Sequence, residues 1–323
     1  MKRDLRIVFM GTPDFAVPSL DTLIRQNYNV VGVITAPDKP SGRGQQVNQS
    51  AVKKYAVEKG LNILQPEKLK SPDFINELRS LNANLFIVVA FRMLPEVVWQ
   101  MPEYGTFNLH ASLLPQYRGA APINWAVING EKETGVTTFF LQQEIDTGNI
   151  IFQEKITIED EDNAGTVHDK LMMVGAQLVL KTVQAIAANS FETISQFSHP
   201  ASIAPLKHAP KLFKETCQIH WNKNTTEIHN LIRGLSPYPA AFTFLDGKVL
   251  KIYKSKISAV SNHEMENNIG VFRYVLNDIS LLTDKRTFLS FKCNDGYLDI
   301  LELQLEGKKK MKVDEFLRGY KFN

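Results

Sequence analysis

Short apolar runs alternate with helix-like segments over the first 190 residues of the chain. The run at 5–10 is closed by Gly11, and the run at 85–91 is apolar almost throughout, which is typical of a strand covered on both faces. Ser71 followed by Pro72 marks the start of a helix. Further strands are predicted at 30–37, 62–66, 106–111, 136–143 and 149–158, and one long helix at 163–189.

Strands that alternate with helices predict an α/β fold with a mostly parallel, Rossmann-like sheet. In such sheets ligands bind at the carboxyl ends of the strands. The first strand is followed by Gly11, Thr12 and Pro13, without the G-x-G-x-x-G or Walker patterns. The turn is therefore not expected to hold a pyrophosphate, and the likeness to a dinucleotide-binding domain is one of architecture only.

The pattern changes after about residue 190. Residues 191–208 show little periodicity and contain several Pro and Ser, which predicts a linker over the surface. A helix at 225–235 then precedes a series of short strands, two of whose joins carry Asp-Gly. Such strands predict a small, OB-like β-barrel. We therefore expect a Rossmann-like domain at 1–190, a linker at 191–208 and a β-barrel domain at 209–323.

Composition narrows the class of protein. The chain has 323 residues, of which 44% are apolar and 22% charged, as in ordinary globular proteins. No uninterrupted apolar run approaches about 18 residues, so no membrane contact is expected. The first apolar run is too short for a signal peptide. Cys217 and Cys293 are far apart and lack metal spacing, which predicts a reducing, cytoplasmic setting.

Positive charge is concentrated in the C-terminal third. Residues 206–323 hold 19 Lys and Arg against 13 Asp and Glu, while residues 1–205 hold 18 against 21. The net charge of +3 therefore comes from the C-terminal part. This asymmetry favours a polyanionic partner for that part of the chain.

Three polar residues form the candidate chemistry. Asn108 and His110 are two apart in a predicted strand, so they point to the same side near its carboxyl end. Asp146 follows in "EIDTG", between the next two predicted strands. A carboxylate beside an imidazole fixes its orientation and favours its protonated form. Together the three can stabilise an oxyanion and move one proton, as an acyl transfer without a covalent intermediate requires.

Each residue also has a purely structural explanation. An isolated Asn or His near a strand end is most often a turn former or a hydrogen-bonded core residue. Ser112 near His110 suggests a nucleophile, but no G-x-S-x-G motif is present and its hydroxyl is better placed to bond the local backbone. Spacing alone therefore leaves the function open.

A family resemblance narrows these choices. "NLHASLLPQYRGAAPI", with "EIDTG" behind it, resembles the signature of the 10-formyltetrahydrofolate-dependent formyltransferases. That signature is shared with relatives that formylate amino sugars or glycinamide ribonucleotide. The stretches "FMGTPDFAVPSLDTL", "PDKPSGRGQQVNQSAVKKYA" and "LIRGLSPYPAAFT" are similar to the members that formylate methionyl-tRNA, so the resemblance covers nearly the whole chain.

The resemblance implies roles for individual residues. The family's catalytic Asn, His and Asp fall on Asn108, His110 and Asp146. In the loop before "LP", relatives commonly carry a Tyr-Gly pair and one more residue, whereas "AFRMLP" is shorter and basic. The residues implied in folate binding are Ser112, Leu113, Leu114 and Pro115 together with Phe91, Arg92, Met93 and Leu94.

The implied reaction moves a formyl group from 10-formyltetrahydrofolate to the α-amino group of methionyl initiator tRNA, for translation initiation. Asn108 and His110 are expected to hold the oxyanion of the tetrahedral intermediate, and protonated His110 to assist departure of the folate nitrogen. The family uses folate as the formyl donor and needs no metal. Nothing in the sequence demands a dimer, so we expect a monomer.

The tRNA is expected to contact a loop and the basic barrel. Gly42 and Gly44 flank Arg43, which suits a loop that enters a groove, and the resemblance implies that Arg43 reaches the acceptor end. Strand alternation predicts Lys248, Lys254 and Lys256 on one face and Lys251 on the other, provided that no bulge intervenes. The residues expected to contact tRNA are Lys39, Arg43, Lys207, Lys211, Lys248 and Lys254.

Two alternatives remain at this point. A formyltransferase for a nucleotide-linked amino sugar would share Asn108, His110 and Asp146 but would not require the Gly-Arg-Gly loop or the basic barrel. A non-catalytic RNA-binding protein on a decayed scaffold would not require an intact Asn, His and Asp set. "KKKMK" at 308–312 is either part of the tRNA surface or a solvated edge, and "LSPYP" at 235–239 is read as a rigid turn that anchors the barrel.

Overall fold

The computed structural model describes residues 3–41, 46–198, 205–259, 270–276 and 279–322. The chain forms two compact units. The first comprises Met1–Pro122, Glu133–Thr157 and His168–His208, and the second comprises Ile123–Lys132, Ile158–Val167 and Ala209–Asn323. The second unit thus takes in two segments that precede the expected boundaries at 190 and 208 in the chain. Those boundaries stay a prediction.

A seven-stranded, mostly parallel sheet forms the centre of the first unit. Its order is β10-β9-β7-β6-β1-β2-β5, and only the pairs β7–β9 and β9–β10 are antiparallel. This confirms the predicted fold class. The strands are β1 (Arg6–Gly11), β2 (Asn29–Ile34), β5 (Ile63–Leu64), β6 (Leu85–Val89), β7 (Thr106–His110), β9 (Glu133–Phe140) and β10 (Ile150–Thr157).

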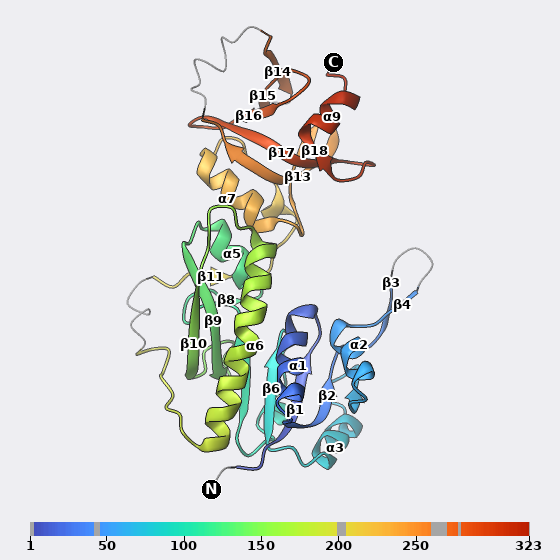
Figure 1. The fold of residues 1–323 in the computed structure, drawn as a ribbon, viewed down its shortest axis with the longest axis vertical. Helices are drawn as coiled ribbons and strands as arrows, with labels where there is room; N and C mark the ends of the chain where they lie inside the picture. Colours follow the sequence, from blue (N-terminus) through green and yellow to red (C-terminus); the bar gives the residue numbers. More distant parts are fainter. Residues whose placement is uncertain (1–2, 42–45, 199–204, 260–269, 277–278, 323) are drawn as a thin grey trace. The chain divides into compact units, whose positions relative to one another are not determined.

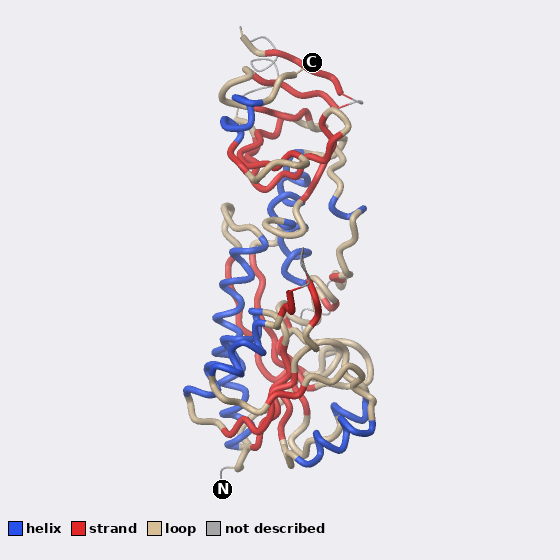
Figure 2. The backbone as a smooth tube through the Cα atoms, turned by 90° about the vertical axis from the view of Figure 1, so that its right-hand side faces the viewer, coloured by secondary structure: helices blue, strands red, loops and turns tan. Residues whose placement is uncertain are grey.

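Helices lie on both sides of this sheet (Figure 2). They explain why β6, in the middle of the sheet, is buried at every residue, as its apolar sequence predicts. The helices of the first unit are α1 (Val17–Arg25), α2 (Ala51–Glu58), α3 (Pro72–Ser80), α4 (Glu96–Trp99) and, from His168 on, α6 (Ala164–Ala188), whereas α5 (Pro122–Ile128) falls almost wholly in the second unit. The unpredicted ones, α2, α4 and α5, are all eight residues or shorter, too short for a clear periodicity.

Helix α6 is the one described helix that is long and apolar enough to cross a membrane by length and composition. The expectation from the sequence considers only uninterrupted apolar runs, and it does not detect α6 as such a segment because polar residues interrupt its apolar sequence. Half of the residues in its apolar stretch are buried inside the protein, and the helix lies along the sheet (Figure 1). Thr182 Oγ1 lies 2.9 Å from Thr138 Oγ1 of β9, and a Cβ on Gly175 would lie 2.7 Å from Leu109 Cδ2 of β7.

The second unit contains an antiparallel sheet of the predicted barrel type. Its order is β12-β13-β17-β16-β15-β14, with β18 beside β17. Among the described residues β12 and β14 do not pair, so the sheet is a half-open barrel. Its strands are β12 (Ala241–Leu245), β13 (Lys248–Ile257), β14 (Phe272–Leu276), β15 (Ile279–Thr283), β16 (Leu289–Lys292), β17 (Tyr297–Leu305) and β18 (Met311–Lys312), and its helices are α7 (Thr225–Leu235) and α9 (Val313–Gly319).

The apolar face of α7 fills this half-open barrel. Ile228, Ile232 and Leu235 recur at helical spacing and join the buried cluster formed by the inner faces of the strands. Trp221 stacks on Phe291 with ring centres 4.3 Å apart. The prediction of α7 at 225–235 is confirmed to the residue, because a capping box at its start and a strong apolar stripe define it locally.

The end of α7 explains why the second unit includes earlier parts of the chain. The buried guanidinium of Arg233 donates to the carbonyl oxygens of Asp162 at 3.2 Å and Glu159 at 3.4 Å. Asn124 Nδ2 donates to the carbonyl of Gly234 at 2.8 Å. The "RGL" stretch therefore ties segments 123–132 and 158–167 to the barrel helix.

The "LSPYP" turn follows directly. The Gly165 N–H donates to the carbonyl of Ser236 at 3.1 Å, and a Cβ on Gly165 would lie 2.6 Å from Pro237 Cδ. These contacts agree with the expected anchoring role of this turn.

Gly135 of β9 is expected to tolerate no side chain. A Cβ there would lie 2.2 Å from the carbonyl oxygen of Glu154 and 2.5 Å from Leu113 Cδ2, and the carbonyl belongs to a paired strand that cannot move freely. Gly135→Ala should lower the free energy of unfolding by about 1–3 kcal/mol, as overpacking does. Urea denaturation measures this.

Gly319→Ala is the matched control, because nothing lies within 4 Å of its Cβ position. If Gly135→Ala unfolds at the same urea concentration as Gly319→Ala, the close packing of β9 against β10 is wrong.

Candidate active site

Strand β7 carries Asn108 and His110 on one face of the sheet. Leu109 between them packs under Gly175 of α6, so alternation directs Asn108 and His110 to the opposite face. Asn108 is half-buried, and its side-chain amide makes no hydrogen bond to any described residue. A half-buried amide with free donors is costly unless a ligand or water satisfies it.

His110 is buried and held on both edges of its ring. Only 7% of the residue is exposed, and Nε2 lies 2.9 Å from the carbonyl oxygen of Tyr117. Because a carbonyl only accepts, Nε2 carries the hydrogen of this bond. Nδ1 lies 4.0 Å from Asp146 Oδ2, an ion pair when the imidazole is protonated. The orientation of the ring is therefore fixed by the protein.

Asp146 lies in the loop between β9 and β10, in a left-handed conformation with φ of 55°. Its Oδ2 accepts a hydrogen bond of 3.1 Å from the Gly119 N–H. Its own carbonyl accepts a bond of 2.9 Å from Gln196 Nε2. The carboxylate that faces His110 is thus held from two other segments. The structure brings Asp146 and His110 together, as the sequence predicts for these two segments.

The segment after β7, expected to bind folate, is mostly interior. Ser112, Leu114 and Pro115 are buried, and only Leu113 is half-buried. Ser112 Oγ donates to the carbonyl of Gln116 at 2.7 Å. This confirms that the Ser112 hydroxyl bonds the local backbone, and a hydroxyl so engaged is unsuited to act as a nucleophile.

The Thr137 side chain of β9 holds the backbone of the segment 112–115. Its hydroxyl donates to the Ser112 carbonyl at 2.6 Å and accepts from the Leu114 N–H at 3.1 Å. Gln153 Nε2 bonds the Leu114 carbonyl at 2.8 Å and the Thr137 hydroxyl at 3.0 Å. The segment is therefore a rigid wall that offers Leu113 as its accessible apolar side chain.

The second expected folate segment follows β6, the parallel neighbour of β7. Phe91 is half-buried, Met93 is 73% exposed and Leu94 is buried in the core beside α3.

Arg92, the basic residue of this shortened loop, turns away into the protein. Its guanidinium donates to the carbonyl oxygens of Glu67, at 2.9 Å, and Pro66, and burial lowers its pKa. Arg92 thus ties the loop after β6 to the segment after β5, a contact that no local sequence pattern predicts.

A shallow hollow of about 460 Å³ lies next to those carbonyls. It is lined by residues 63–68 and by the first turns of α3. Asn108, His110 and Asp146 do not line it, so it is distinct from the candidate site. Within the described ranges no group of three or more His, Cys, Asp or Glu is arranged to hold a metal ion.

The loop expected to meet tRNA forms a hairpin of β3 (Lys39–Ser41) and β4 (Gln46–Asn48). Arg43 lies outside the described residues, and so does the side chain of Lys39. The base of the hairpin is held by Asp38, which pairs with Lys53 and accepts from Gln65 Nε2 at 2.9 Å. These hydrogen bonds from Lys53 and Gln65 lower the pKa of Asp38.

The backbone of Lys207 is hydrogen-bonded to the segment that follows β7. Its N–H donates to Gln116 Oε1 at 2.8 Å, and its carbonyl accepts from the Tyr117 N–H at 2.7 Å. In the second unit Lys211 is exposed, with Nζ 5.9 Å from the centre of the Phe213 ring.

The lysines of β13 do not share the predicted face. The register of β13 against β17 shifts on both sides of Lys254, so Leu250 and Ile252 are buried before the shift and Ser255 after it. The condition of an unbroken strand fails. The corrected outer face carries Lys251, Lys254 and Lys256, while Lys248 falls on the other face.

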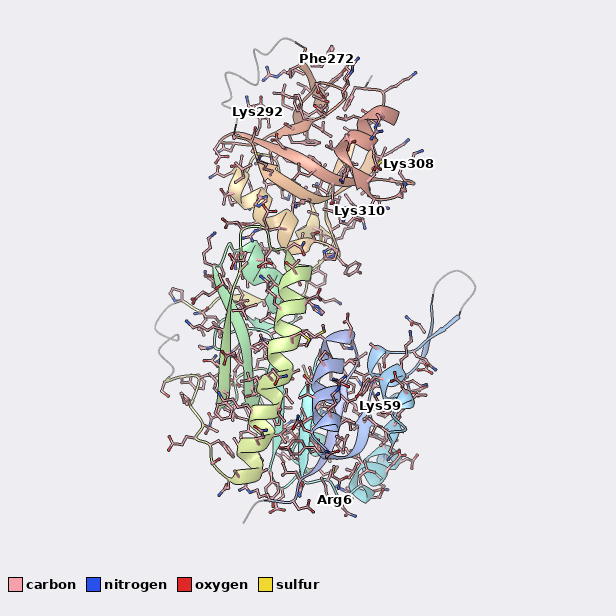
Figure 3. The ribbon with its side chains drawn as sticks, in the orientation of Figure 1. Arg6, Lys59, Phe272, Lys292, Lys308 and Lys310 are labelled. Carbon is pink, nitrogen blue, oxygen red and sulfur yellow. The ribbon has the colours of Figure 1, made fainter. Side chains whose placement is uncertain are left out.

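Neighbouring acids partly offset the charge of that face. Lys254 Nζ lies 3.3 Å from Glu161 Oε2, and Lys310, at the turn between β17 and β18, lies 2.6 Å from Glu302 (Figure 3). Exposed pairs of this kind are worth about 0–1 kcal/mol, so a polyanion displaces them easily. The "KKKMK" stretch that contains Lys310 is thus near this face, and its role stays open.

Comparisons with known proteins agree with the two-unit fold. A family model described as formyl transferase matches residues 5–183, and one described as formyl transferase, C-terminal domain, matches residues 211–321. A methionyl-tRNA formyltransferase of Phocaeicola vulgatus is 59% identical over 99% of this chain and 97% of its own. One from Bacteroides thetaiotaomicron is 53% identical over 100% of this chain and 98% of its own.

Solved structures resemble the chain at lower identity. The sugar 3N-formyl transferase WlaRD, solved with dTDP and 5-N-formyl-THF, has a TM-score of 0.65 and 22% identity, over 95% of this chain and all of its own. HypX from Aquifex aeolicus, in complex with tetrahydrofolic acid, has a TM-score of 0.63 and 16% identity, over 99% of this chain and 49% of its own. At these identities the likeness concerns the fold.

Thr137→Val is expected to lower the free energy of unfolding, because Thr137 holds the segment 112–115 after β7. The change removes a buried hydroxyl and leaves the Leu114 N–H without its partner, which costs about 1–3 kcal/mol. Thr134→Val is the matched control on the same strand, because Thr134 is also buried but makes no side-chain hydrogen bond to a described residue. Equal denaturation midpoints for the two variants would contradict the assigned role of Thr137.

Proposed function

We propose that this chain, which belongs to the formyl transferase family, transfers a formyl group from 10-formyltetrahydrofolate to the α-amino group of methionyl initiator tRNA. The product is N-formylmethionyl-tRNA for translation initiation. The observation that carries this proposal is the Asp146 carboxylate 4.0 Å from His110 Nδ1, with Asn108 on the same face of β7 as His110. The chain that carries them is 50–59% identical to relatives named methionyl-tRNA formyltransferase. We propose these three as the catalytic residues.

The folate donor supplies an activated formyl carbon, so the protein needs to provide only orientation, charge stabilisation and proton transfer. The residues present fit such a group. The loops at 91–94 and 112–115 follow neighbouring parallel strands, and Phe91, Met93 and Leu113 give them partly accessible apolar surface for a flat pterin ring. We propose Ser112, Leu114, Pro115, Arg92 and Leu94 as the residues that hold this surface in shape.

Asn108 stabilises the transition state by donating to the developing oxyanion. No described residue accepts a hydrogen bond from its side-chain amide, and its backbone is fixed within a central strand. A donor of this kind is worth about 3–4 kcal/mol when it is aimed at the charge that develops in the reaction.

His110 transfers the proton through Nδ1. Its Nε2–H is held by the Tyr117 carbonyl, so Nδ1, on the side of Asp146, is the nitrogen that gains and loses the proton. The negative charge of Asp146 stabilises the imidazolium that forms. This arrangement requires no metal ion.

The tRNA is held by two regions of the chain. Lys39 begins the hairpin strand β3, next to Asp38, which pairs with Lys53. Arg43 stands in the sequence between β3 and β4, and we propose that it enters the acceptor end. Lys207, Lys211, Lys248 and Lys254 contact phosphates, with Lys251 and Lys256 on the corrected face of β13. Residues 1–190 form the catalytic domain, 191–208 the linker and 209–323 the tRNA-binding domain.

The protein acts in the cytoplasm as a monomer without membrane contact. Cys217 and Cys293 are both buried, and burial raises the pKa of each thiol, which suits unreactive cysteines in a reducing compartment. An amino-sugar formyltransferase would use the same three catalytic residues. Formylation of charged initiator tRNA, with a nucleotide-linked amino sugar offered in parallel, separates the two functions.

Asn108→Ala should lower kcat for methionyl-tRNA formylation by about 10²–10³-fold, because an oxyanion donor is lost. The affinity for tRNA, measured by filter binding, should stay within about twofold. Asn222→Ala, which removes an exposed amide in the second unit, serves as the control. Loss of tRNA binding in step with activity would assign Asn108 a structural role instead.

Arg43→Leu should lower kcat/KM for initiator tRNA severely, by about 10²-fold or more, because a charge-assisted contact worth several kcal/mol is lost. Thermal unfolding should be unchanged. Lys59→Leu is a control, since Lys59 is exposed at the end of α2, outside the hairpin (Figure 3). Normal formylation by Arg43→Leu would remove Arg43 from the tRNA interface.

A further inference from the structure

Gln196 is a buried polar side chain in the segment that the sequence predicts to be a surface linker. Only 1% of the residue is exposed. Its Nε2 donates to the carbonyl oxygens of Asp146 at 2.9 Å and Gly148 at 2.8 Å. Its Oε1 accepts two bonds from Arg118, from Nε at 3.0 Å and Nη2 at 2.7 Å. Both donor hydrogens and the acceptor are used, which is the condition for burying an amide.

The first pair of bonds holds Asp146 in its unusual conformation. A residue other than glycine with φ of 55° is disfavoured, by about 1 kcal/mol or more, unless its surroundings fix it. The loop is also close to its own strand at Gly148, where a Cβ would lie 1.6 Å from the carbonyl oxygen of Phe140. Gln196 bonds the carbonyls on both sides of Thr147 and so sets the direction of the Asp146 side chain.

The second pair of bonds holds the other arm of the site. Arg118 stands between Tyr117, whose carbonyl accepts from His110, and Gly119, whose N–H donates to Asp146. Burial lowers the pKa of Arg118, while the charge of Asp146 opposes this effect. Gln196 therefore connects both backbone segments that hold His110 and Asp146.

The segment that carries Gln196 is itself anchored. Ile194 exchanges two backbone hydrogen bonds of 2.9 Å with Ile150, the first residue of β10. Gln196 thus reaches Asp146 from a backbone that is paired with the sheet, which gives it the rigidity that a positioning group needs.

We propose that Gln196 is a positioning residue for formyl transfer, which sets the distance between the Asp146 carboxylate and the His110 imidazole. The proposal rests on the proposed function and adds the segment 194–196 to the active site. Misplacing a catalytic group by about 1 Å costs up to about 10²-fold in rate, so the effect is large enough to measure.

Gln196→Met keeps the length of the side chain but removes all four hydrogen bonds. We expect kcat to fall by about 10–100-fold while KM for tRNA and for the folate donor stays within about twofold. If the variant folds poorly, Gln196→Glu keeps an acceptor for Arg118 and, when ionised, loses both bonds to the loop, with the same expected fall in kcat.

A second background tests whether Gln196 acts through Asp146. In Asp146→Asn the charge is already absent, so Gln196→Met should there lower kcat by less than about threefold, because coupled residues are not additive. An equal loss in both backgrounds, or wild-type kcat for Gln196→Met, overturns the proposal. Gln142→Met is the matched control. Gln142 lies in the loop that carries Asp146, but its side chain bonds the Thr147 hydroxyl and not the carbonyl of Asp146.

Failure of the proposed function is recognised separately, by wild-type protein that does not formylate methionyl-tRNA. The positioning role is then decided by the imidazole ¹⁵N signals of His110, assigned with His110→Gln. Gln196→Met should move these signals in the direction that Asp146→Asn moves them. Unchanged signals overturn the proposal, whatever reaction the site performs.

Discussion

The imidazole of His110, fixed between the carbonyl of Tyr117 and the carboxylate of Asp146, is the interaction on which the site depends. A buried ring with two polar atoms is stable only when both face partners, and each partner here comes from a different loop. The chain therefore has to bring the loop after β7 and the loop after β9 to one point. The antiparallel pairing of β7 with β9 places His110 beside Thr137, and the loop after β9 starts at the other end of β7, where the Leu141 N–H donates to the Thr106 carbonyl at 2.8 Å. The loop therefore has to fold back to reach His110, and the hydrogen bonds that Asp146 accepts from Gly119 and Gln196 hold it there.

The polar side chains around the site differ in whether a described residue of the protein satisfies them. The side chains of Ser112, Thr137 and Gln153 form their hydrogen bonds with one another and with the backbone. These bonds make the segment 112–115 after β7 rigid. The side-chain amide of Asn108, on β7, makes no hydrogen bond within the described part of the chain. A preorganised wall beside a free donor is the arrangement that stabilises charge developing on a substrate, since the protein does not need to reorganise during the reaction.

In the second unit, the apolar face of α7 fills the half-open barrel, and its end binds segments from much earlier in the chain. The buried guanidinium of Arg233 needs acceptors, and it finds them in the carbonyls of residues 159 and 162. The family stretch that contains Arg233 and the following Ser-Pro turn thus has a structural use. The anchored segment also places Glu161 beside Lys254, so one lysine on the outer face of β13 has an exposed acidic partner that a polyanion would have to displace.

The sequence is enough to predict the longer strands of the two sheets, the long helices and the face of β7 on which Asn108 and His110 lie. These features depend on local periodicity, and β6, α6 and α7 each carry a pattern long enough to define them. The segment of Asp146 was also found from the sequence, because its acidic residue stands in a family signature.

The other features of the fold and of the site depend on contacts between distant parts of the chain. The register shift at Lys254 arises from pairing with β17 and puts Lys254 and Lys256 on the face of β13 that carries Lys251. The short helices and the hairpin at 39–48 lack a local pattern of sufficient length. Gln196 could not be found from the sequence, because a glutamine in an aperiodic stretch is buried only when distant backbone groups, here those of Asp146 and Gly148 and the side chain of Arg118, satisfy it.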